Sequence, residues 1–556
     1  MSISYSKIKK IAYFCLLLPS IVFVLGFIRW YIALPVAILL ATAYFFVLRD
    51  AKKEAVEYED KTLNITTKQL FIVIGIVTVW CFLSGLGNLY YQSEDWSSRN
   101  AIFRDLIRFD WPIIYPEKNA ALVYYIGYWL PPALIGKLFF GMSADLDVAW
   151  MAGNIALLVW SVVCVVVVML MTMMYLKIAT KKHFWIAIAI FIAFSGMDIV
   201  GTVVYNYWHS IPISNHIEWW SIYQYSSMVT CLGWVFNQAI LSWLATICFL
   251  MEKKTRNYAF IIVCAVASAP MPCVGLAAYM VGVAAVQLFN ALREKRAKAF
   301  WRDVLTVQNI IPVLTLIPLY FLYYITNVAV NIGQAGVKMP HDLYAIILTA
   351  SLAGGFAVLG ILLKIFKKNW WSFKLFFLAG TALVLFVGSL INVQIRLNYL
   401  AFITLESILF LFVLWDDHKK DPIFYISWGL TLICPLIKVG TASDFCMRAT
   451  IPLVFVLMIM STKYMIDHAH LLKEKKISYV KITCVILMIF LILGAFTPLK
   501  EFERGFEQII ANGKINLVFD DVFTFKKFFP GGVGFRDKNF IAVDYEHTLF
   551  FRHIAK

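Results

Sequence analysis

Long apolar stretches recur from one end of the chain to the other, and this pattern restricts the possible folds more than any other feature. A stretch of about 20 apolar residues is long enough to cross a lipid bilayer as a helix. The composition agrees, because 61% of the residues are hydrophobic and only 15% are charged, against roughly 25% charged residues in soluble domains. A transmembrane β-barrel would show short segments of alternating hydrophobicity instead. We therefore predict an all-α polytopic membrane protein.

The apolar pattern predicts a bundle of about 13 to 15 transmembrane helices. The segment 258–290 is long for one span and short for two, and it carries Pro270 and Pro272 near its centre. Basic clusters flank both of its ends, so we expect a hairpin of two helices there. The predicted spans are 11–28, 31–48, 69–87, 147–176, 183–204, 228–250, 258–272, 274–290, 306–326, 343–363, 373–391, 399–415, 423–437, 449–466 and 482–498.

The distribution of Lys and Arg predicts the orientation of the chain in the membrane. With these spans, the basic loops fall on the same side as the N-terminus, and cytoplasmic loops are the ones that carry such an excess. We therefore expect a cytoplasmic N-terminus and an extracytoplasmic C-terminal tail. This arrangement explains the net charge of +16, and no nucleic acid is expected as a partner. The basic loops are 49–68, 177–182, 252–256, 293–302, 364–368, 416–420 and 463–481.

Three regions follow along the chain: an N-terminal helical hairpin with a cytoplasmic loop (1–68), a transmembrane module (69–498) and an extracytoplasmic tail (499–556). Within the module, 88–146 form a large first extracytoplasmic loop. Its stretch RNAIFRDLIRFDW places Ile102, Leu106 and Phe109 on one helical face, which predicts an interfacial helix. The apolar segment 119–141 is broken by two prolines and predicts a second interfacial helix or a re-entrant segment. The tail suits a small cap containing β-strands or an arm on the membrane surface.

The first loop opens with the adjacent carboxylates Glu94 and Asp95. A carboxylate at a boundary between water and membrane can act as a general base towards a sugar hydroxyl, so we expect one of the two to act and the other to orient or bind. The alternative is a hydrated pair of loop carboxylates. Arg99 and Arg104 follow, and guanidinium groups bind phosphate by paired hydrogen bonds. Anionic lipid headgroups or salt bridges to Asp105 and Asp110 are the alternatives.

Two further clusters lie in predicted extracytoplasmic loops. His216 and Glu218 stand among aromatic residues, which suit carbohydrate binding, a metal or proton transfer, or simply an aromatic belt at the interface. Asp444 and Arg448 are four residues apart just before a span, so they form a salt bridge or meet a lipid-linked phosphate. Asp198 lies in the outer half of a predicted span, where a carboxylate is costly unless it is paired. The sequence does not identify its partner.

The large first loop that opens with Glu94 and Asp95, the interfacial helices, the many spans with short loops and the tail together resemble the GT-C superfamily of integral-membrane glycosyltransferases. This superfamily includes protein O-mannosyltransferases, aminoarabinose transferases and oligosaccharyltransferases. The resemblance covers Leu70 to about Pro498 in architecture and rests at residue level on the acidic pair and its loop. In the superfamily the acidic pair usually follows the first span, whereas here it follows the third, so the first two spans would be an added hairpin.

The resemblance implies an inverting glycosyltransferase whose donor is a polyprenyl-phosphate-linked sugar, because no nucleotide-sugar pool exists outside the cytoplasm. The acceptor would be a glycan, a lipid or a protein. Asp95, or alternatively Glu94, would deprotonate the acceptor hydroxyl. A divalent metal such as Mg²⁺ or Mn²⁺ is compatible with the reaction, but no cofactor is required. The residues implied for the donor phosphate are Arg99, Arg104 and Arg448, and those implied for substrate binding are His216, Glu218 and Asp444.

Two other functions stay open. A polysaccharide polymerase or ligase would depend on extracytoplasmic Arg and His and would need no carboxylate in the first loop. A flippase or transporter of lipid-linked sugars would favour internal repeats and charges buried within spans, and the sequence shows no repeat and few such charges. The composition, rich in Lys, Ile and Phe, is compatible with the cell membrane of a bacterium of low genomic GC content.

Overall fold

The computed structural model describes residues 2–57, 62–93, 95–209, 216–331, 399, 401–437, 439, 444–476, 478–513 and 539–556. Within these residues, eight helices are long and apolar enough to cross a membrane. A ninth span results if Lys181–Ala193 and Asp198–Asn206, which are bent by 41° relative to each other, are counted together. The predicted all-α polytopic membrane protein is therefore confirmed. The predicted spans 343–363 and 373–391 lie outside the described residues.

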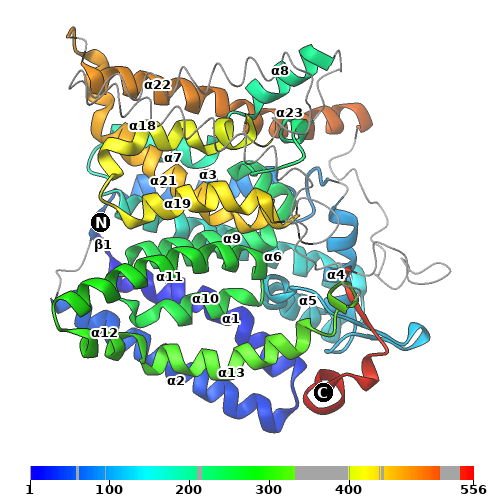
Figure 1. Cartoon of the computed structure of the whole chain (residues 1–556). Helices are drawn as coiled ribbons and strands as arrows, with labels where there is room; N and C mark the ends of the chain where they lie inside the picture. Colours follow the sequence, from blue (N-terminus) through cyan, green and yellow to red (C-terminus); the bar gives the residue numbers. More distant parts are fainter. Residues whose placement is uncertain are drawn as a thin grey trace. The chain divides into compact units, whose positions relative to one another are not determined.

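The chain divides into two units. Unit 1 comprises Met1–Phe184, Thr230–Ala335 and Phe502–Lys556, and unit 2 comprises Trp185–Val229 and Gly336–Glu501. The chain passes from one unit to the other within the helices α7 (Lys181–Ala193), α9 (Met228–Met251) and α23 (Phe496–Asn512). The described helices of unit 1 (Figure 1) are α1 (Tyr5–Phe27), α2 (Trp30–Glu57), α3 (Thr67–Leu83), α4 (Trp96–Arg108), α5 (Leu130–Ser143), α6 (Leu146–Tyr175), α10 (Tyr258–Val266), α11 (Pro270–Arg293), α12 (Ala297–Val304), α13 (Val307–Tyr324) and α14 (Val328–Asn331).

Unit 2 is built from shorter helices. A five-residue π-helical turn, Thr404–Ile408, leads directly into α18. The helix α8 follows α7 after a break at 194–197, where the chain bends. The described helices of unit 2 are α8 (Asp198–His209), α18 (Leu409–His418), α19 (Pro422–Ile433), α20 (Asp444–Ala449), α21 (Ile451–His468) and α22 (Tyr479–Gly494).

Prolines begin helices in this protein at two places where the sequence suggested a break. Pro270 is the first residue of α11, and α10 ends at Val266, so the segment 258–290 forms two helices as predicted. Pro131 and Pro132 lie in the first turn of α5, where the missing amide hydrogen of proline costs little. The segment 119–141 is thus not a single helix that its prolines interrupt. It consists of the strand β4 (Ala120–Leu122), a 3-10 turn and α5.

One end of unit 1 gathers segments that the sequence assigns to the cytoplasmic side. The strand β1 (Ser2–Ser4) pairs antiparallel with β2 (Thr62–Asn64), which joins the N-terminus to the loop after α2. Beyond α9, the buried carboxylate of Glu252 lies 2.6 Å from Lys9 Nζ and accepts hydrogen bonds from Tyr13 and Asn257. These contacts bring the start of α1 and the loop between α9 and α10 together.

The other end of unit 1 gathers segments that the sequence assigns to the extracytoplasmic side. The strands β3 (Ile114–Tyr115) and β4 of the first loop form a three-stranded antiparallel sheet with β5 (Ile541–Val543) of the tail, in the order β3-β4-β5. Arg29, between α1 and α2, donates from Nε to the carbonyl oxygen of Ala555 over 2.8 Å. The tail therefore contributes a strand to the first loop. Figure 1 shows the two chain ends at opposite ends of unit 1.

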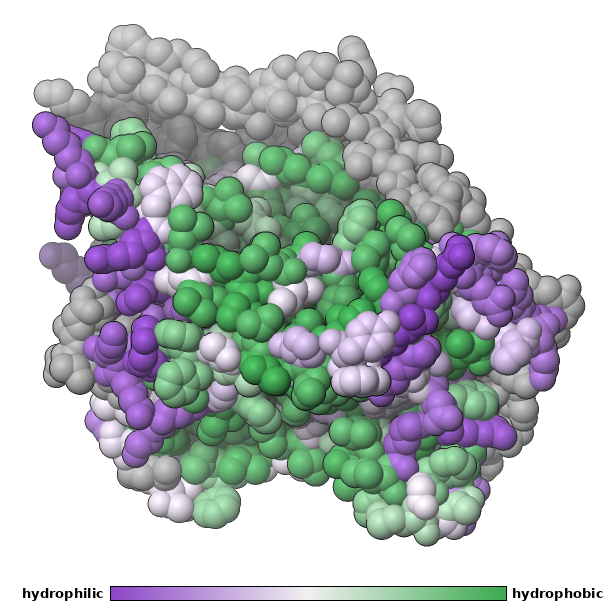
Figure 2. Space-filling view, turned by 90° about the horizontal axis from the view of Figure 1, so that it is seen from below, coloured by the Kyte–Doolittle hydropathy of each residue, from purple (hydrophilic) through white to green (hydrophobic). Residues whose placement is uncertain are grey.

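Large hydrophobic side chains are exposed along the helices between these two ends. Leu34, Ile38 and Phe45 of α2 and Leu314 and Phe321 of α13 each expose more than 50% of their surface. Figure 2 shows the face below α2 and α13, where hydrophobic residues fill the centre and hydrophilic residues lie towards both sides. A hydrophobic belt between polar margins is what a lipid bilayer requires of a protein that crosses it.

The buried pair of Lys9 and Glu252 generates a stability prediction. Burial alone would raise the pKa of Glu252, but Lys9 and the hydrogen bonds from Tyr13 and Asn257 hold it below its ordinary value. We expect Glu252→Gln to lower the free energy of unfolding by about 3 to 5 kcal/mol, because it leaves the ammonium of Lys9 buried without a counter-charge. Thermal or chemical unfolding of the purified protein in detergent measures this difference.

The matched control is Glu294→Gln, which removes an exposed carboxylate paired with Arg296 and should cost less than about 1 kcal/mol. Because the pKa of Glu252 is lower in the folded protein, its carboxylate stabilises the fold at a pH above the pKa of a glutamate in the unfolded chain, about 4.3. This stabilisation is lost as the pH falls below that value. Wild type should therefore lose more stability in acid than Glu252→Gln does. Equal losses for Glu252→Gln and Glu294→Gln would contradict the expected cost.

Candidate functional site

The first loop begins with a tight turn that folds back on the end of α3. Gly85 and Gly87 have φ values of +85° and +91°, a region that other residues seldom adopt. The side chain of Gln92 donates to the carbonyl oxygen of Gly85 over 2.9 Å and accepts from Asn100 over 2.7 Å. The turn is thereby fixed to the first turns of α4.

Trp96 anchors the start of α4 to α9. Its indole nitrogen donates to the carbonyl oxygen of Gly233 over 2.8 Å, and its ring stacks on that of Phe236 with centroids 4.8 Å apart. Further along α4, Ile102 and Leu106 are fully buried, as the amphipathic pattern predicted, whereas Phe109 caps the helix and is only partly buried. The helix contacts α5 and α6, so the segment that bears the candidate residues is held firmly within unit 1.

Asp95 and Arg99 meet at the head of α4. Arg99 Nη2 lies 3.0 Å from Asp95 Oδ2, with the aspartate side chain 54% exposed and the arginine side chain 8% exposed. Arg99 Nη1 is buried and has no hydrogen-bond partner among the described residues. The structure thus brings an accessible carboxylate and a buried guanidinium together at this point. Glu94 lies outside the described residues.

Arg104 is directed to a different carboxylate. Its Nη2 lies 2.9 Å from Asp147 Oδ1 at the start of α6, and its guanidinium lies over the ring of Trp150. The salt-bridge partners that the sequence offered were Asp105 and Asp110, whereas the structure pairs Arg104 with Asp147. The ion pair of Arg104 and Asp147 joins α4 to the start of α6.

Sequence reasoning missed Arg504, which the fold places beside the first loop. It lies on α23, more than 400 residues later in the chain, and its guanidinium is 5.8 Å from the ring centroid of Tyr91 and 4.8 Å from that of Trp234. The same stretch of α23 packs on the turn, since Phe506 contacts Tyr90 edge to face. Only the long-range packing of the tail helix reveals this arginine, so no local pattern signals it.

The helix α9 adds polar groups beside this turn. It departs from helical geometry at Val235, close to the residues that bind Trp96. Two and three residues later, Asn237 Nδ2 and Gln238 Oε1 are buried without a hydrogen-bond partner among the described residues. Buried amide groups are normally hydrogen-bonded, so these two are ready to bind a polar ligand or water.

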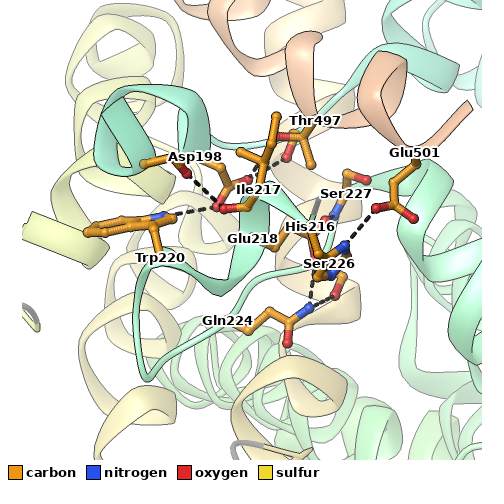
Figure 3. A network of polar contacts seen from close by, with 12 residues as sticks. Asp198, His216, Ile217, Glu218, Trp220, Gln224, Ser226, Ser227, Thr497 and Glu501 are labelled. Atoms are coloured by element: carbon orange, nitrogen blue, oxygen red, sulfur yellow. Dashed lines mark hydrogen bonds and ion pairs between the residues drawn. The ribbon is translucent and has the colours of Figure 1, made fainter. Parts of the chain in front are cut away.

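Unit 2 holds the cluster that contains His216 and Glu218 (Figure 3). His216 Nδ1 lies 2.6 Å from Glu501 Oε1, and His216 Nε2 lies 3.9 Å from Glu218 Oε2. Glu218 also accepts from Gln224 Nε2 over 2.7 Å and from the backbone amide of Ser227 over 2.9 Å. His216 and Glu218 are both buried, so they are part of a packed polar network.

Asp198 lies beside this network, at the first residue of α8. It accepts hydrogen bonds from Ser195, Trp220 and Thr497, and its carboxyl group adjoins that of Glu406. These are the partners that the sequence did not identify. Figure 3 shows the side chains of Trp220 and Thr497 converging on Asp198.

Asp444 and Arg448 form the predicted ion pair within α20, with Arg448 Nη2 3.5 Å from Asp444 Oδ1. The arginine side chain is largely buried and the aspartate side chain is about half exposed.

In the part of the chain that the structure describes, no group of three or more His, Cys, Asp or Glu side chains is arranged to hold a metal ion. The division of the chain into two units separates the candidate residues into two sets. Unit 1 holds Asp95, Arg99 and Arg104, and unit 2 holds His216, Glu218, Asp444 and Arg448.

Comparison of the chain with protein-family models, with curated proteins and with solved structures found no match.

The turn that holds the first-loop site yields a prediction. A methyl group at Gly85 would lie 2.8 Å from the carbonyl oxygen of Tyr91, and the positive φ adds strain. We expect Gly85→Ala to destabilise the protein by at least about 1 to 2 kcal/mol, seen as a lower thermal midpoint in detergent. Gly75→Ala is the control, because nothing lies within 4 Å of its added methyl group on α3. Equal midpoints for both variants would show that the turn is not constrained as described.

Proposed function

We propose that this protein is an inverting membrane glycosyltransferase that moves a sugar from a polyprenyl-phosphate donor to an extracytoplasmic glycan, lipid or protein. The proposal joins the resemblance of the first loop to the GT-C superfamily with one structural observation. At the head of α4, an accessible carboxylate, Asp95, lies 3.0 Å from a buried arginine, Arg99. These are the two kinds of group that the reaction needs side by side.

In the proposed reaction, Asp95 takes the proton of the acceptor hydroxyl as that oxygen attacks the anomeric carbon of the sugar. The bond between the anomeric carbon and the phosphate oxygen breaks, and the polyprenyl phosphate leaves with the electron pair. A carboxylate that is about half exposed can be reached by an acceptor, whereas a fully buried one cannot. Glu94, its neighbour in the sequence, keeps the predicted role of orienting or binding the acceptor.

The leaving phosphate gains negative charge, and positioned arginines would stabilise it. Arg99 is suited to this role because its buried Nη1 has no hydrogen-bond partner among the described residues. Arg504 brings a second guanidinium close to the turn, over Tyr91 and Trp234. Arg104 and Arg448, which the resemblance also implies for the donor phosphate, are ion-paired with Asp147 and Asp444.

The substrate-binding roles proposed for His216, Glu218 and Asp444 rest on their chemistry. A buried imidazole with two neighbouring carboxylates and an amide network can bind sugar hydroxyls. A divalent metal is compatible with the reaction and is not required by it. The donor is proposed to enter from the lipid, as its polyprenyl chain demands.

The general-base role of Asp95 is tested by Asp95→Asn. We expect the variant to transfer sugar about 10²- to 10⁴-fold more slowly than wild type, which is the usual contribution of a general base. The assay incubates purified protein with radiolabelled polyprenyl-phosphate sugars and a membrane extract, and follows the label into a new product. The matched control is Asp110→Asn, which changes an exposed carboxylate in the same loop and should leave the rate unchanged. Equal rates for wild type and Asp95→Asn would remove Asp95 as the base.

The proposed orientation places the first loop and the tail outside the cytoplasm. All ten cysteines are buried, so we expect a maleimide to label an added exposed cysteine with little reaction at the native ones. We expect Glu546→Cys, in the exposed tail, to react with a membrane-impermeant maleimide on intact cells. Glu294→Cys, exposed after α11, should react only after the cells are permeabilised. The reverse pattern would invert the orientation and leave the proposed donor on the wrong side.

A transporter of lipid-linked sugars is a second candidate, and one observation in unit 2 favours it. The break between α7 and α8 has the buried carboxyl group of Asp198 at its edge. Interrupted helices with charged groups at the break hold substrates or ions in many transporters. If wild type moves a labelled polyprenyl-phosphate sugar across vesicles and forms no new glycosidic product, transport is the function.

A further inference from the structure

Asp198 is surrounded by groups that suit its ionised form. Ser195 Oγ and Thr497 Oγ1 donate to Asp198 Oδ2 over 3.1 and 3.3 Å, and Trp220 Nε1 donates to Asp198 Oδ1 over 3.2 Å. Both oxygens of the carboxylate thus accept hydrogen bonds from neutral donors (Figure 3). The aspartate is also the first residue of α8, where the helix dipole favours a negative charge. Hydrogen bonds to the charged form stabilise it even where water is excluded.

Glu406, unlike Asp198, is not surrounded by hydrogen-bond donors among the described residues. It lies in the π-helical turn before α18 and is only 3% exposed. Its two carboxyl oxygens are buried, and neither accepts a hydrogen bond from a donor among the described residues. The group beside its carboxyl is that of Asp198, and Gly196 lies so close that an added Cβ there would overlap Glu406. Glu406 therefore points into the site of Asp198, and no described residue donates a hydrogen bond that would stabilise its negative charge.

Among the residues that the structure describes, no positive charge compensates the two carboxyl groups. Within the described residues, neither Asp198 nor Glu406 forms an ion pair with Lys, Arg or His. The other titratable groups that act on Glu406 are acidic or neutral: Glu218, Tyr225 and Cys446. Two adjacent carboxylates without a cation repel each other, and a buried charge without partners costs several kcal/mol. A carboxylic acid, in contrast, carries a proton that it can donate to a neighbouring carboxylate.

We propose that Asp198 and Glu406 form a proton-binding site in which Glu406 holds one proton and donates it to the carboxylate of Asp198. One proton satisfies both groups: Asp198 gains a fourth donor, and Glu406 becomes a neutral donor. Both residues stand where a regular helix is interrupted, at the break before α8 and in the π-helical turn before α18. Such interruptions recur at functional sites, and ionisable groups within membrane bundles are typical of proton pathways.

The proton site is tested with Glu406→Gln, which keeps the size of the side chain and replaces the acidic proton by an amide donor. Infrared difference spectroscopy of the purified protein in detergent at neutral pH is expected to show a protonated carboxyl band in wild type that shifts in heavy water. The band should be absent from Glu406→Gln and present in Glu474→Gln, an exposed glutamate of unit 2. A spectrum of Glu406→Gln identical to that of wild type would overturn the proposal.

Stability against pH provides an independent measurement. The unfolded chain releases the proton of Glu406 above about pH 4.3, whereas the folded protein keeps it, so raising the pH favours unfolding. We expect the unfolding equilibrium of wild type to rise by up to tenfold per pH unit relative to that of Glu406→Gln. Parallel pH profiles for wild type and Glu406→Gln would overturn the proposal. If sodium removes the infrared band and stabilises only wild type, the pair binds sodium in place of a proton, and the proposal fails in that way.

Asp198→Asn separates the roles of the two residues. The asparagine carbonyl can still accept a hydrogen bond from a protonated Glu406, so the carboxyl band should persist at a shifted position. Loss of the band in Asp198→Asn with retained folding would place the proton on Asp198 and overturn the assignment to Glu406. If this variant does not fold, the comparison of wild type with Glu406→Gln decides the question alone.

Discussion

A lipid bilayer offers no hydrogen-bond partner to the polypeptide backbone, and the rest of this structure depends on that constraint. The described spans satisfy their backbone groups within helices, and the described strands are two or three residues long. In unit 1 these strands lie at the ends, where β1 pairs with β2 and the β3-β4-β5 sheet joins the first loop to the tail. Irregular backbone is thus kept away from the exposed hydrophobic belt of α2 and α13.

The irregular backbone is also where the polar side chains gather. Asp95 and Arg99 lie at the start of α4, which follows the turn after α3, and α9 departs from helical geometry at Val235, just before its two buried amide side chains. In unit 2 the break before α8 and the π-helical turn bear Asp198 and Glu406. In a regular helix the backbone groups are already hydrogen-bonded to each other, so polar side chains inside the membrane are not needed to bind them. Polar groups are retained there at interruptions, where they either complete the backbone or bind something else.

The sequence predicted the features that depend on local periodicity and charge. The all-α class, the hairpin at 258–290 and the burial of Ile102 and Leu106 all follow from patterns within a few turns of helix. The contacts of the sites could not be predicted in the same way. Arg504 reaches Tyr91 only because the tail helix packs on the first loop, and the partners of Asp198 come from segments as distant as Thr497. Such contacts depend on how helices pack, which no pattern of hydrophobic residues specifies.

The protein buries carboxylates in two ways, and the difference is instructive. Glu252 is buried against the ammonium of Lys9, so each charge neutralises the other, and hydrogen bonds from Tyr13 and Asn257 complete the site. Asp198 and Glu406 are buried with neutral donors and with each other. A fixed cation such as Lys9 locks a carboxylate in its ionised form and suits a structural joint. Where the neighbour is a second carboxyl group, the charge depends on whether a proton is bound. The pair of Asp198 and Glu406 therefore has the chemistry of a binding site, whereas the pair of Lys9 and Glu252 has that of a structural contact.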